Sequence, residues 1–378
     1  MLKTPLTSVV ALLGFAGSAL ADVPKVATDI APVHGLVARV MQGVGEPSLV
    51  VPAGASPHHH SMRPSEALAL SQADVVFWIG EALTPWLEGA VDELAKDAHV
   101  VELLDLKAGL ALPFREGVGF EAHDHGDEEG HDEAHHDDHD DAHEDHEGHD
   151  HDKHDDHDHE KHDEHEGHDD HDHEAHAEDD HAHDEAHDES HEDEHAGHDH
   201  EGHEGHNHEG IDPHAWLSPE NATLWLDVIA AELSEHDAEN AASYAANAAA
   251  GKLEIQQAKA EIMASLGPVR DGGFVVFHDA YQYFEQSFDI QAAGAIGLSD
   301  ASDPSPARIA EIQQVVKEKQ VSCVFSEPQF NPDLVATVLE GSGAKTVVID
   351  PLGTGLELGA NFYPALLKEL GSAMASCY

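Results

Sequence analysis

The chain has 378 residues, two cysteines and a formal net charge of −60 at pH 7. So acidic a chain is not expected to bind nucleic acid or an anionic membrane surface, whereas it should attract cations, unless its acidic surface is merely solvated. The length allows two domains of ordinary size besides a long polar segment.

The first residues have the pattern of a secretory signal peptide, which we place at residues 1–21. Lys3 precedes an apolar run over residues 9–15, and Ala19-Leu20-Ala21 resembles a cleavage site. No later apolar run is long enough to cross a bilayer. The sequence therefore predicts a soluble protein exported to the periplasm.

Residues 22–120 alternate short apolar runs with helical patterns, as an N-terminal α/β lobe would. The expected strands are residues 25–30, 48–51, 75–79 and 99–104, and the expected helices are residues 32–41, 64–71 and 84–96. Such βα repetition predicts a mostly parallel sheet with right-handed crossovers.

Residues 121–210 form a His/Asp/Glu-rich segment without a periodic apolar pattern. The segment holds 29 of the 37 His and 41 of the 77 acidic residues of the chain, against two lysines. It cannot bury enough apolar surface to offset the entropy of ordering, so we expect a disordered loop that binds divalent metal weakly. An inert polyelectrolyte linker is the alternative. The accessory metal ligands expected here include His123, His125, His131, His151, His171, His198, His206 and His208.

The rest of the chain predicts a second α/β lobe behind a long helical connector. We assign residues 211–235 to the end of the first lobe, 236–267 to an interlobe helix and 268–378 to the C-terminal lobe. The pattern over residues 220–266 fits one long helix or two consecutive helices. Expected strands follow at 273–277, 321–325 and 346–349, with helices at 280–288, 307–319, 332–341 and 363–374. The fold class is thus α/β, with two doubly wound parallel-sheet lobes joined by a rigid helix.

Metal-ligating residues lie where such lobes bind ligands. His278 and Asp350 each follow an expected strand, His58 lies in the loop after the strand at 48–51, and His214 precedes a helix start. Ligands of doubly wound sheets bind beyond the carboxyl ends of the strands. Three imidazoles and one carboxylate match the four-coordinate N and O donor set of Zn²⁺.

Several alternatives to this ligand set remain open. His59 and His60 could replace His58, and His34 begins the first crossover and could face the same crevice. Asp350 could instead cap the turn that follows it, a common use of Asp. Any single His is more often a hydrogen-bonded structural residue than a ligand.

Cys323 and Cys377 are the only cysteines of the chain. In an oxidising compartment such a pair is more often a disulfide than a metal site, with two free buried thiols as the alternative. A bond closing this loop would stabilise the fold by roughly 4 kcal/mol.

Five motifs follow one another along both halves of the chain: Gly54-Ala55-Ser56-Pro57-His58, Pro213-His214-Ala215-Trp216-Leu217-Ser218-Pro219, Val276-Phe277-His278-Asp279-Ala280-Tyr281, Ser326-Glu327-Pro328-Gln329-Phe330 and Asp350-Pro351-Leu352-Gly353. These motifs resemble those of the zinc-binding ZnuA branch of the cluster A-I (cluster 9) solute-binding proteins of ABC transporters. The resemblance covers nearly the whole chain outside the His/Asp/Glu-rich segment. It implies two lobes joined by a long helix, with one metal held between them and delivered to a membrane permease.

The resemblance implies that the zinc-binding imidazoles are those of His58, His214 and His278, and that Cys323 pairs with Cys377. Manganese-carrying members usually have Glu where this chain has His278, and imidazole favours Zn²⁺. Some zinc members have Glu immediately before the first His, where this chain has Pro57. The fourth ligand is therefore expected to be Asp350 or a water molecule.

We accordingly expect the zinc-binding component of an ABC importer, a monomer that serves a permease and an ATPase and could also exchange zinc with a periplasmic chaperone. Zn²⁺ is the transported ligand, and its binding should weaken as the pH falls below the imidazole pKa of about 6.5. A periplasmic zinc buffer or metallochaperone is the alternative. A zinc hydrolase is disfavoured, because the sequence has no His-Glu-x-x-His or comparable motif.

Overall fold

The structure, a computed structural model, describes residues 23–115, 117–120, 210–270, 272–297 and 304–378. These residues belong to one compact unit. The expected signal peptide, and the expected disorder and metal ligands of the His/Asp/Glu-rich segment, lie outside the described residues.

The first lobe is built on a parallel sheet with the strand order β2-β1-β3-β4. Its strands are β1 (Val26–Thr28), β2 (Ser48–Leu49), β3 (Val75–Trp78) and β4 (His99–Glu102), and its helices are α1 (Ala31–Val40), α2 (Pro64–Ser71) and α3 (Pro85–Leu94). Each of these helices has Pro at its first or second position, where the missing N–H costs no hydrogen bond.

Strand β3 is buried on both faces, as its unbroken apolar run predicts. Successive side chains of a strand point to opposite faces. Val76 and Trp78 pack with buried residues of α2 and α3. Val75 and Phe77 instead belong to a larger core that includes residues of α1 and extends into the second lobe.

The second lobe repeats this plan with a parallel sheet in the order β6-β5-β7-β8. Its strands are β5 (Phe274–His278), β6 (Gly294–Gly297), β7 (Cys323–Ser326) and β8 (Lys345–Val348), and its helices are α7 (Gln282–Phe288), α8 (Pro306–Glu318), α9 (Pro332–Val338) and α10 (Phe362–Ala375). The sequence did not predict β6. The prediction of α/β lobes with parallel sheets is confirmed.

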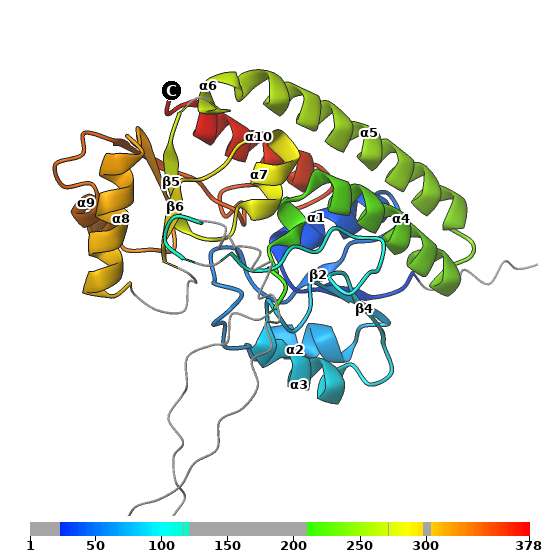
Figure 1. The fold of residues 1–378 in the computed structure, drawn as a ribbon. Coiled ribbons are helices and arrows are strands. Elements are labelled where there is room, and N and C mark those ends of the chain that lie inside the picture. The colour runs from blue at the N-terminus through cyan, green and yellow to red at the C-terminus, as the bar shows by residue number, and fades with distance from the viewer. Residues whose placement is uncertain (1–22, 116, 121–209, 271, 298–303) are drawn as a thin grey trace, which may run out of the picture. The chain divides into compact units, whose positions relative to one another are not determined.

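In chain order, the described residues between β4 and β5 form the short helix η1 (Ala215–Leu217) and the helices α4 (Pro219–His236), α5 (Ala241–Ser265) and α6 (Gly267–Arg270). The helical pattern thus forms two long helices, separated at Asp237, whose carboxylate accepts hydrogen bonds from Asn240 and from the Tyr244 hydroxyl. Figure 1 shows α5 alongside α4 and α10, and α5 also packs against α1. One helix therefore contacts helices of both lobes.

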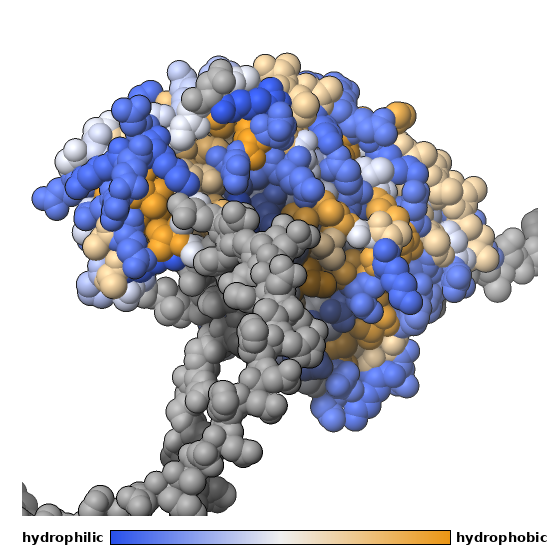
Figure 2. Space-filling model, in the orientation of Figure 1, coloured by the Kyte–Doolittle hydropathy of each residue, from blue (hydrophilic) through white to orange (hydrophobic). Residues whose placement is uncertain are grey.

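Glycine permits the close approach of α5 to its neighbours. A Cβ at Gly251 would lie 3.0 Å from side-chain atoms of Arg39 in α1 and Leu226 in α4. A Cβ at Gly371 in α10 would lie 2.7 Å from Ile262 of α5. Figure 2 shows weakly hydrophobic residues, in tan, over the surface that the Ala-rich α5 occupies in Figure 1.

Cys323 and Cys377 form a disulfide with a Cα–Cα distance of 6.0 Å, as predicted. The bond ties the first residue of β7 to the end of the chain beyond α10. Among the described residues, the helices are all too short or too polar to span a bilayer.

Candidate metal centre

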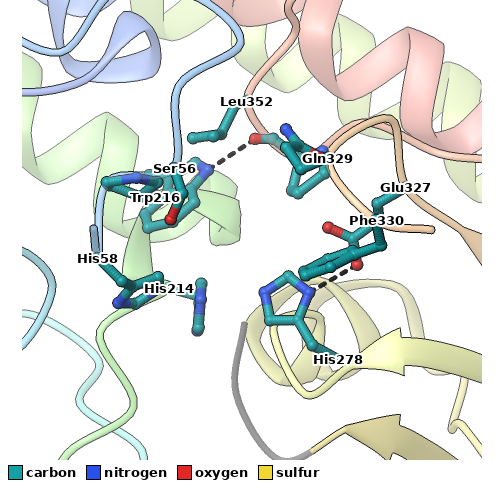
Figure 3. A pocket seen from close by; sticks show the side chains of 11 residues that line it. Ser56, His58, His214, Trp216, His278, Glu327, Gln329, Phe330 and Leu352 are labelled. Atoms are coloured by element: carbon teal, nitrogen blue, oxygen red, sulfur yellow. Dashed lines mark hydrogen bonds and ion pairs between the residues drawn. The ribbon is translucent and has the colours of Figure 1, made fainter. Parts of the chain in front are cut away.

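Three imidazoles from separate parts of the chain meet in one cavity. His58 lies in the loop after β2, His214 immediately precedes η1, and His278 is the last residue of β5. The ring centroids of His58 and His214 are 5.6 Å apart, and those of His214 and His278 are 5.2 Å apart. Figure 3 shows His58 and His214 on one side of the cavity and His278 on the other. The remaining lining residues are Ser56, Pro57, Trp216, Glu327, Gln329, Phe330, Pro351 and Leu352.

Carboxylates orient two of these imidazoles. Nδ1 of His214 lies 2.7 Å from Oδ1 of Asp212, and Nδ1 of His278 lies 2.6 Å from Oε1 of Glu327, a contact drawn in Figure 3. When the carboxylate is ionised it can only accept, and Nδ1 then carries the proton and donates it. In that tautomer Nε2 is the ring nitrogen that carries the lone pair and that would bind a metal, as in carboxylate–histidine–zinc arrangements.

The carboxyl of Asp212 is buried, so ionising it costs free energy. Burial raises the pKa of this carboxyl to about 7, opposed by the hydrogen bond from the His214 backbone N–H, by the charge of Arg115 and, when that imidazole is protonated, by the charge of His278. A divalent cation nearby would favour the ionised form. A metal ion in the cavity would therefore favour the ionised carboxylate of Asp212, and that carboxylate in turn favours the proton on Nδ1 of His214.

Arg115 ties the chain before residue 121 to the second lobe. Its guanidinium contacts Asp279, the neighbour of His278, and donates from Nη1 to Oε2 of Glu285 at 2.7 Å. Burial raises the pKa of the Asp279 and Glu285 carboxyls, and the charge of Arg115 opposes this rise. For Arg115 itself, burial lowers the pKa, but the two acidic partners raise it by more. The single positive charge of Arg115 thus offsets the negative charge of the two carboxyls only in part.

Comparison with known proteins agrees with this geometry. The family model of the zinc-uptake complex component A, periplasmic (ZnuA), matches residues 26–377. The chain belongs to the ZnuA family. It is 42% identical to the high-affinity zinc uptake system protein ZnuA of Brucella abortus (strain 2308) over 367 residues, which cover 97% of this chain and 95% of that protein. It is 41% identical to the protein of the same name from Paracoccus denitrificans (strain Pd 1222) over 360 residues, covering 95% and 93%.

The fold matches solved ZnuA-type structures. A crystal structure of ZnuA superposes with a TM-score of 0.60 at 18% identity, covering 93% of this chain and 100% of the other. The sequence-based assignment to this family is therefore confirmed. The family is described as a periplasmic component of a zinc-uptake complex, and both relatives are named as proteins of a high-affinity zinc uptake system.

Asp350, the carboxylate that the sequence offered as a fourth ligand, faces its own turn. Oδ1 accepts hydrogen bonds from the backbone N–H groups of Leu352 and Gly353 at 3.0 Å each, and Oδ2 accepts one from Thr354 at 2.6 Å. Asp350 is not among the residues that line the cavity, whereas Glu327 is. The turn-capping role left open by the sequence is thus present.

The other candidate histidines do not line this cavity. Nε2 of His60 lies 2.8 Å from Oε2 of Glu66, and His59 is exposed. Nε2 of His34, in α1, lies 3.2 Å from the carbonyl oxygen of Pro47, and this residue lines a different pocket. The structure therefore brings together His58, His214 and His278.

Sequence reasoning assigned no role to Asp212 and Glu327. The sequence nevertheless places both residues close to a ligand. Asp212 lies two residues before His214. Glu327 directly follows β7, and β7 pairs with β5, whose last residue is His278. Carboxyl ends of neighbouring parallel strands meet at one edge of a sheet, so a contact between Glu327 and His278 could have been anticipated.

Proposed function

We propose that this chain captures Zn²⁺ through His58, His214 and His278 and delivers it to the permease of an ABC zinc importer. The observation that carries the proposal is the pair of anchored imidazoles, His214 on Asp212 and His278 on Glu327, whose rings lie 5.2 Å apart. Neutral nitrogen donors held by outer carboxylates suit Zn²⁺ better than Ca²⁺ or Mg²⁺.

The fourth coordination position is proposed to hold a water molecule. Asp350 uses its oxygens to cap its own turn, and Pro57 stands where some zinc members have Glu. Three protein ligands with one exchangeable position would let zinc dissociate at the permease without breaking a closed four-ligand site.

A transport role is preferred over hydrolysis. The side chains around the imidazoles include Trp216, Phe330 and Leu352. Hydrolysis needs a positioned general base, and the carboxylate of Glu327 already accepts a hydrogen bond from His278. Such surroundings favour binding of the ion alone.

Uptake and release are proposed to use loop motion and modest rearrangement of the lobes. Helix α5 packs against α1 of the first lobe and α10 of the second, and the main core includes residues of both. A large hinge rotation would disrupt this packing. Interlobe distances from paired spin labels should differ little between the zinc-free and zinc-bound protein, and a large rotation would contradict this mechanism.

The His/Asp/Glu-rich segment is proposed to hold further Zn²⁺ ions weakly and to raise the local zinc concentration. Its density of imidazoles and carboxylates supports this role. We further propose that a signal peptide directs export and that the mature protein acts as a monomer, with a periplasmic zinc chaperone as a possible donor.

A pair of adjacent histidines provides the test of the cavity site. His58→Ala removes a proposed ligand, whereas His59→Ala changes an exposed neighbour that does not line the cavity. In competition with a chromophoric chelator, His58→Ala should lose tight zinc binding and His59→Ala should keep it. The opposite result would overturn the ligand assignment.

A further inference from the structure

A second group of metal-ligating side chains lies where β4 meets the end of α4, and none of its members lines the cavity described above. His99 is the first residue of β4, and Glu232 and His236 lie in the last turns of α4. One ligand atom of each residue lies within 4.8 Å of those of the other two. Oε1 of Glu232 is 3.2 Å from Nε2 of His236 and also contacts Nδ1 of His99.

Regular secondary structure holds these residues in place. Glu232 and His236 are four residues apart on a helix, so their side chains share one face. The backbone N–H of His99 donates to the carbonyl oxygen of Asp74 at 2.9 Å, which fixes the start of β4 against β3. Sites built on helices and strands keep their geometry better than sites on loops.

The exposure of the side chains suits an exchangeable ion. The His99 and His236 side chains are 57% and 32% exposed, whereas that of Glu232 is 12% exposed. Zn²⁺ binds imidazole nitrogen at about 2.0–2.1 Å and carboxylate oxygen at about 2.0–2.2 Å, so bound ligand atoms lie roughly 3–4 Å apart. Small rotations of the exposed imidazoles would bring the three atoms to this spacing.

We propose that His99, Glu232 and His236 form a second, solvent-exposed Zn²⁺ site on the folded part of the chain. Two neutral imidazoles and one carboxylate supply a single negative charge and a mixed N and O donor set, which favours Zn²⁺ over Ca²⁺ and Mg²⁺. Water completes the coordination, so the ion exchanges readily. The site adds surface zinc binding that depends neither on the cavity nor on the His/Asp/Glu-rich segment.

The test is carbethoxylation of histidines in the full chain, mapped by peptide mass spectrometry during titration with Zn²⁺ alone. Zinc should protect His99 and His236 with one shared midpoint, and Ca²⁺ should protect neither. If these two residues were only a hydrogen-bonded group with Glu232, zinc would leave their modification unchanged, which would overturn the proposal.

Two matched substitutions on α4 identify the ligand. Glu232→Gln should raise the zinc concentration for half-protection of both histidines by roughly tenfold or more, since even outer-shell partners contribute about 10–100-fold to metal affinity. Glu235→Gln removes the same charge from an exposed position of that helix and should leave the midpoint unchanged. Equal effects of the two substitutions would overturn the site. His236→Ala should abolish the protection of His99, and retained protection would also contradict the proposal.

Discussion

Pro113 and Ile211 form an isolated antiparallel bridge that joins the chain before the His/Asp/Glu-rich segment to the chain after it. The backbone N–H of Phe114 donates to the carbonyl oxygen of Gly210 at 3.2 Å, and that of Asp212 donates to Leu112 at 2.8 Å. Residues 112–114 and residues 210–212 therefore lie side by side. This pairing does not require a particular length of chain between them.

Deleting residues 124–208 should leave a folded protein that keeps its tight zinc site and the proposed surface site at His99, Glu232 and His236, and that lacks the weak sites of the segment. The bridge already holds the two ends together, and loop-closure entropy changes slowly with loop length. Zinc calorimetry on the deleted and full-length chains measures both classes of site. Loss of the tight site on deletion would show that its assignment to the cavity is wrong.

The double substitution His58→Ala, His278→Ala in the full-length chain should have the reverse effect. Removing two of the three proposed nitrogen donors should abolish the tight phase in calorimetry, whereas the weak phase of the His/Asp/Glu-rich segment should persist. Circular dichroism checks that the fold is retained. A tight phase of unchanged affinity would exclude this cavity as the primary site.

Glu327→Gln should weaken zinc binding by about 10–100-fold, because the amide no longer stabilises the Nδ1–H of His278 as a carboxylate does. Glu340→Gln, on an exposed residue of the same lobe, is the control for the lost charge. Chelator competition gives both affinities. Equal affinities for the two variants would mean that Glu327 has no part in orienting the ligand.

Asp29 should make the stability of the zinc-free protein depend on pH. The carboxylate is buried beyond β1 and accepts hydrogen bonds from the backbone N–H groups of Ile30 and Ile79 at 2.7 Å each. Burial raises its pKa from 3.8 to about 7, although these hydrogen bonds lower it. The folded state thus retains a proton that the unfolded state releases. The contribution of the Asp29 carboxyl to the free energy of unfolding is fully present below about pH 4 and is lost as the pH rises through about 7. Over this range the free energy of unfolding should fall by up to about 1.4 kcal/mol per pH unit because of this group.

Asp29→Asn cannot titrate, so its free energy of unfolding should fall less steeply over this range than that of the unmodified protein. Urea unfolding with a chelator present, at several pH values, measures the two slopes. Any constant offset from lost hydrogen bonding does not affect the comparison. Parallel slopes would contradict the raised pKa of Asp29.

Local sequence patterns predicted most of the helices and strands. The exception is β6, which depends on a contact with a segment distant in the sequence. The unbroken apolar sequence of β3 predicts a buried strand from its own residues, whereas the sequence of β6, Gly-Ala-Ile-Gly, has no such pattern. A Cβ at Gly294 would lie 2.3 Å from the carbonyl oxygen of Val118, so Gly is needed where a remote segment crosses this strand. Such a requirement has no signature in the strand itself.

The candidate site divides in the same way. His58, His214 and His278 could be proposed as ligands from their places beside strand ends and a helix start. The orienting contact between His278 and Glu327 spans 49 residues and appears only when β5 and β7 are paired. For Asp350, the local turn pattern and the ligand hypothesis were equally compatible with the sequence, and only the structure shows the three backbone donors.

The contacts of Arg115 and Asp212 give the two ends of the His/Asp/Glu-rich segment different mechanical connections. Arg115 holds the incoming chain to Asp279, next to His278, while the outgoing chain reaches Asp212, which orients His214. The chain on each side of the segment is therefore attached to a residue that adjoins or orients a different imidazole of the cavity.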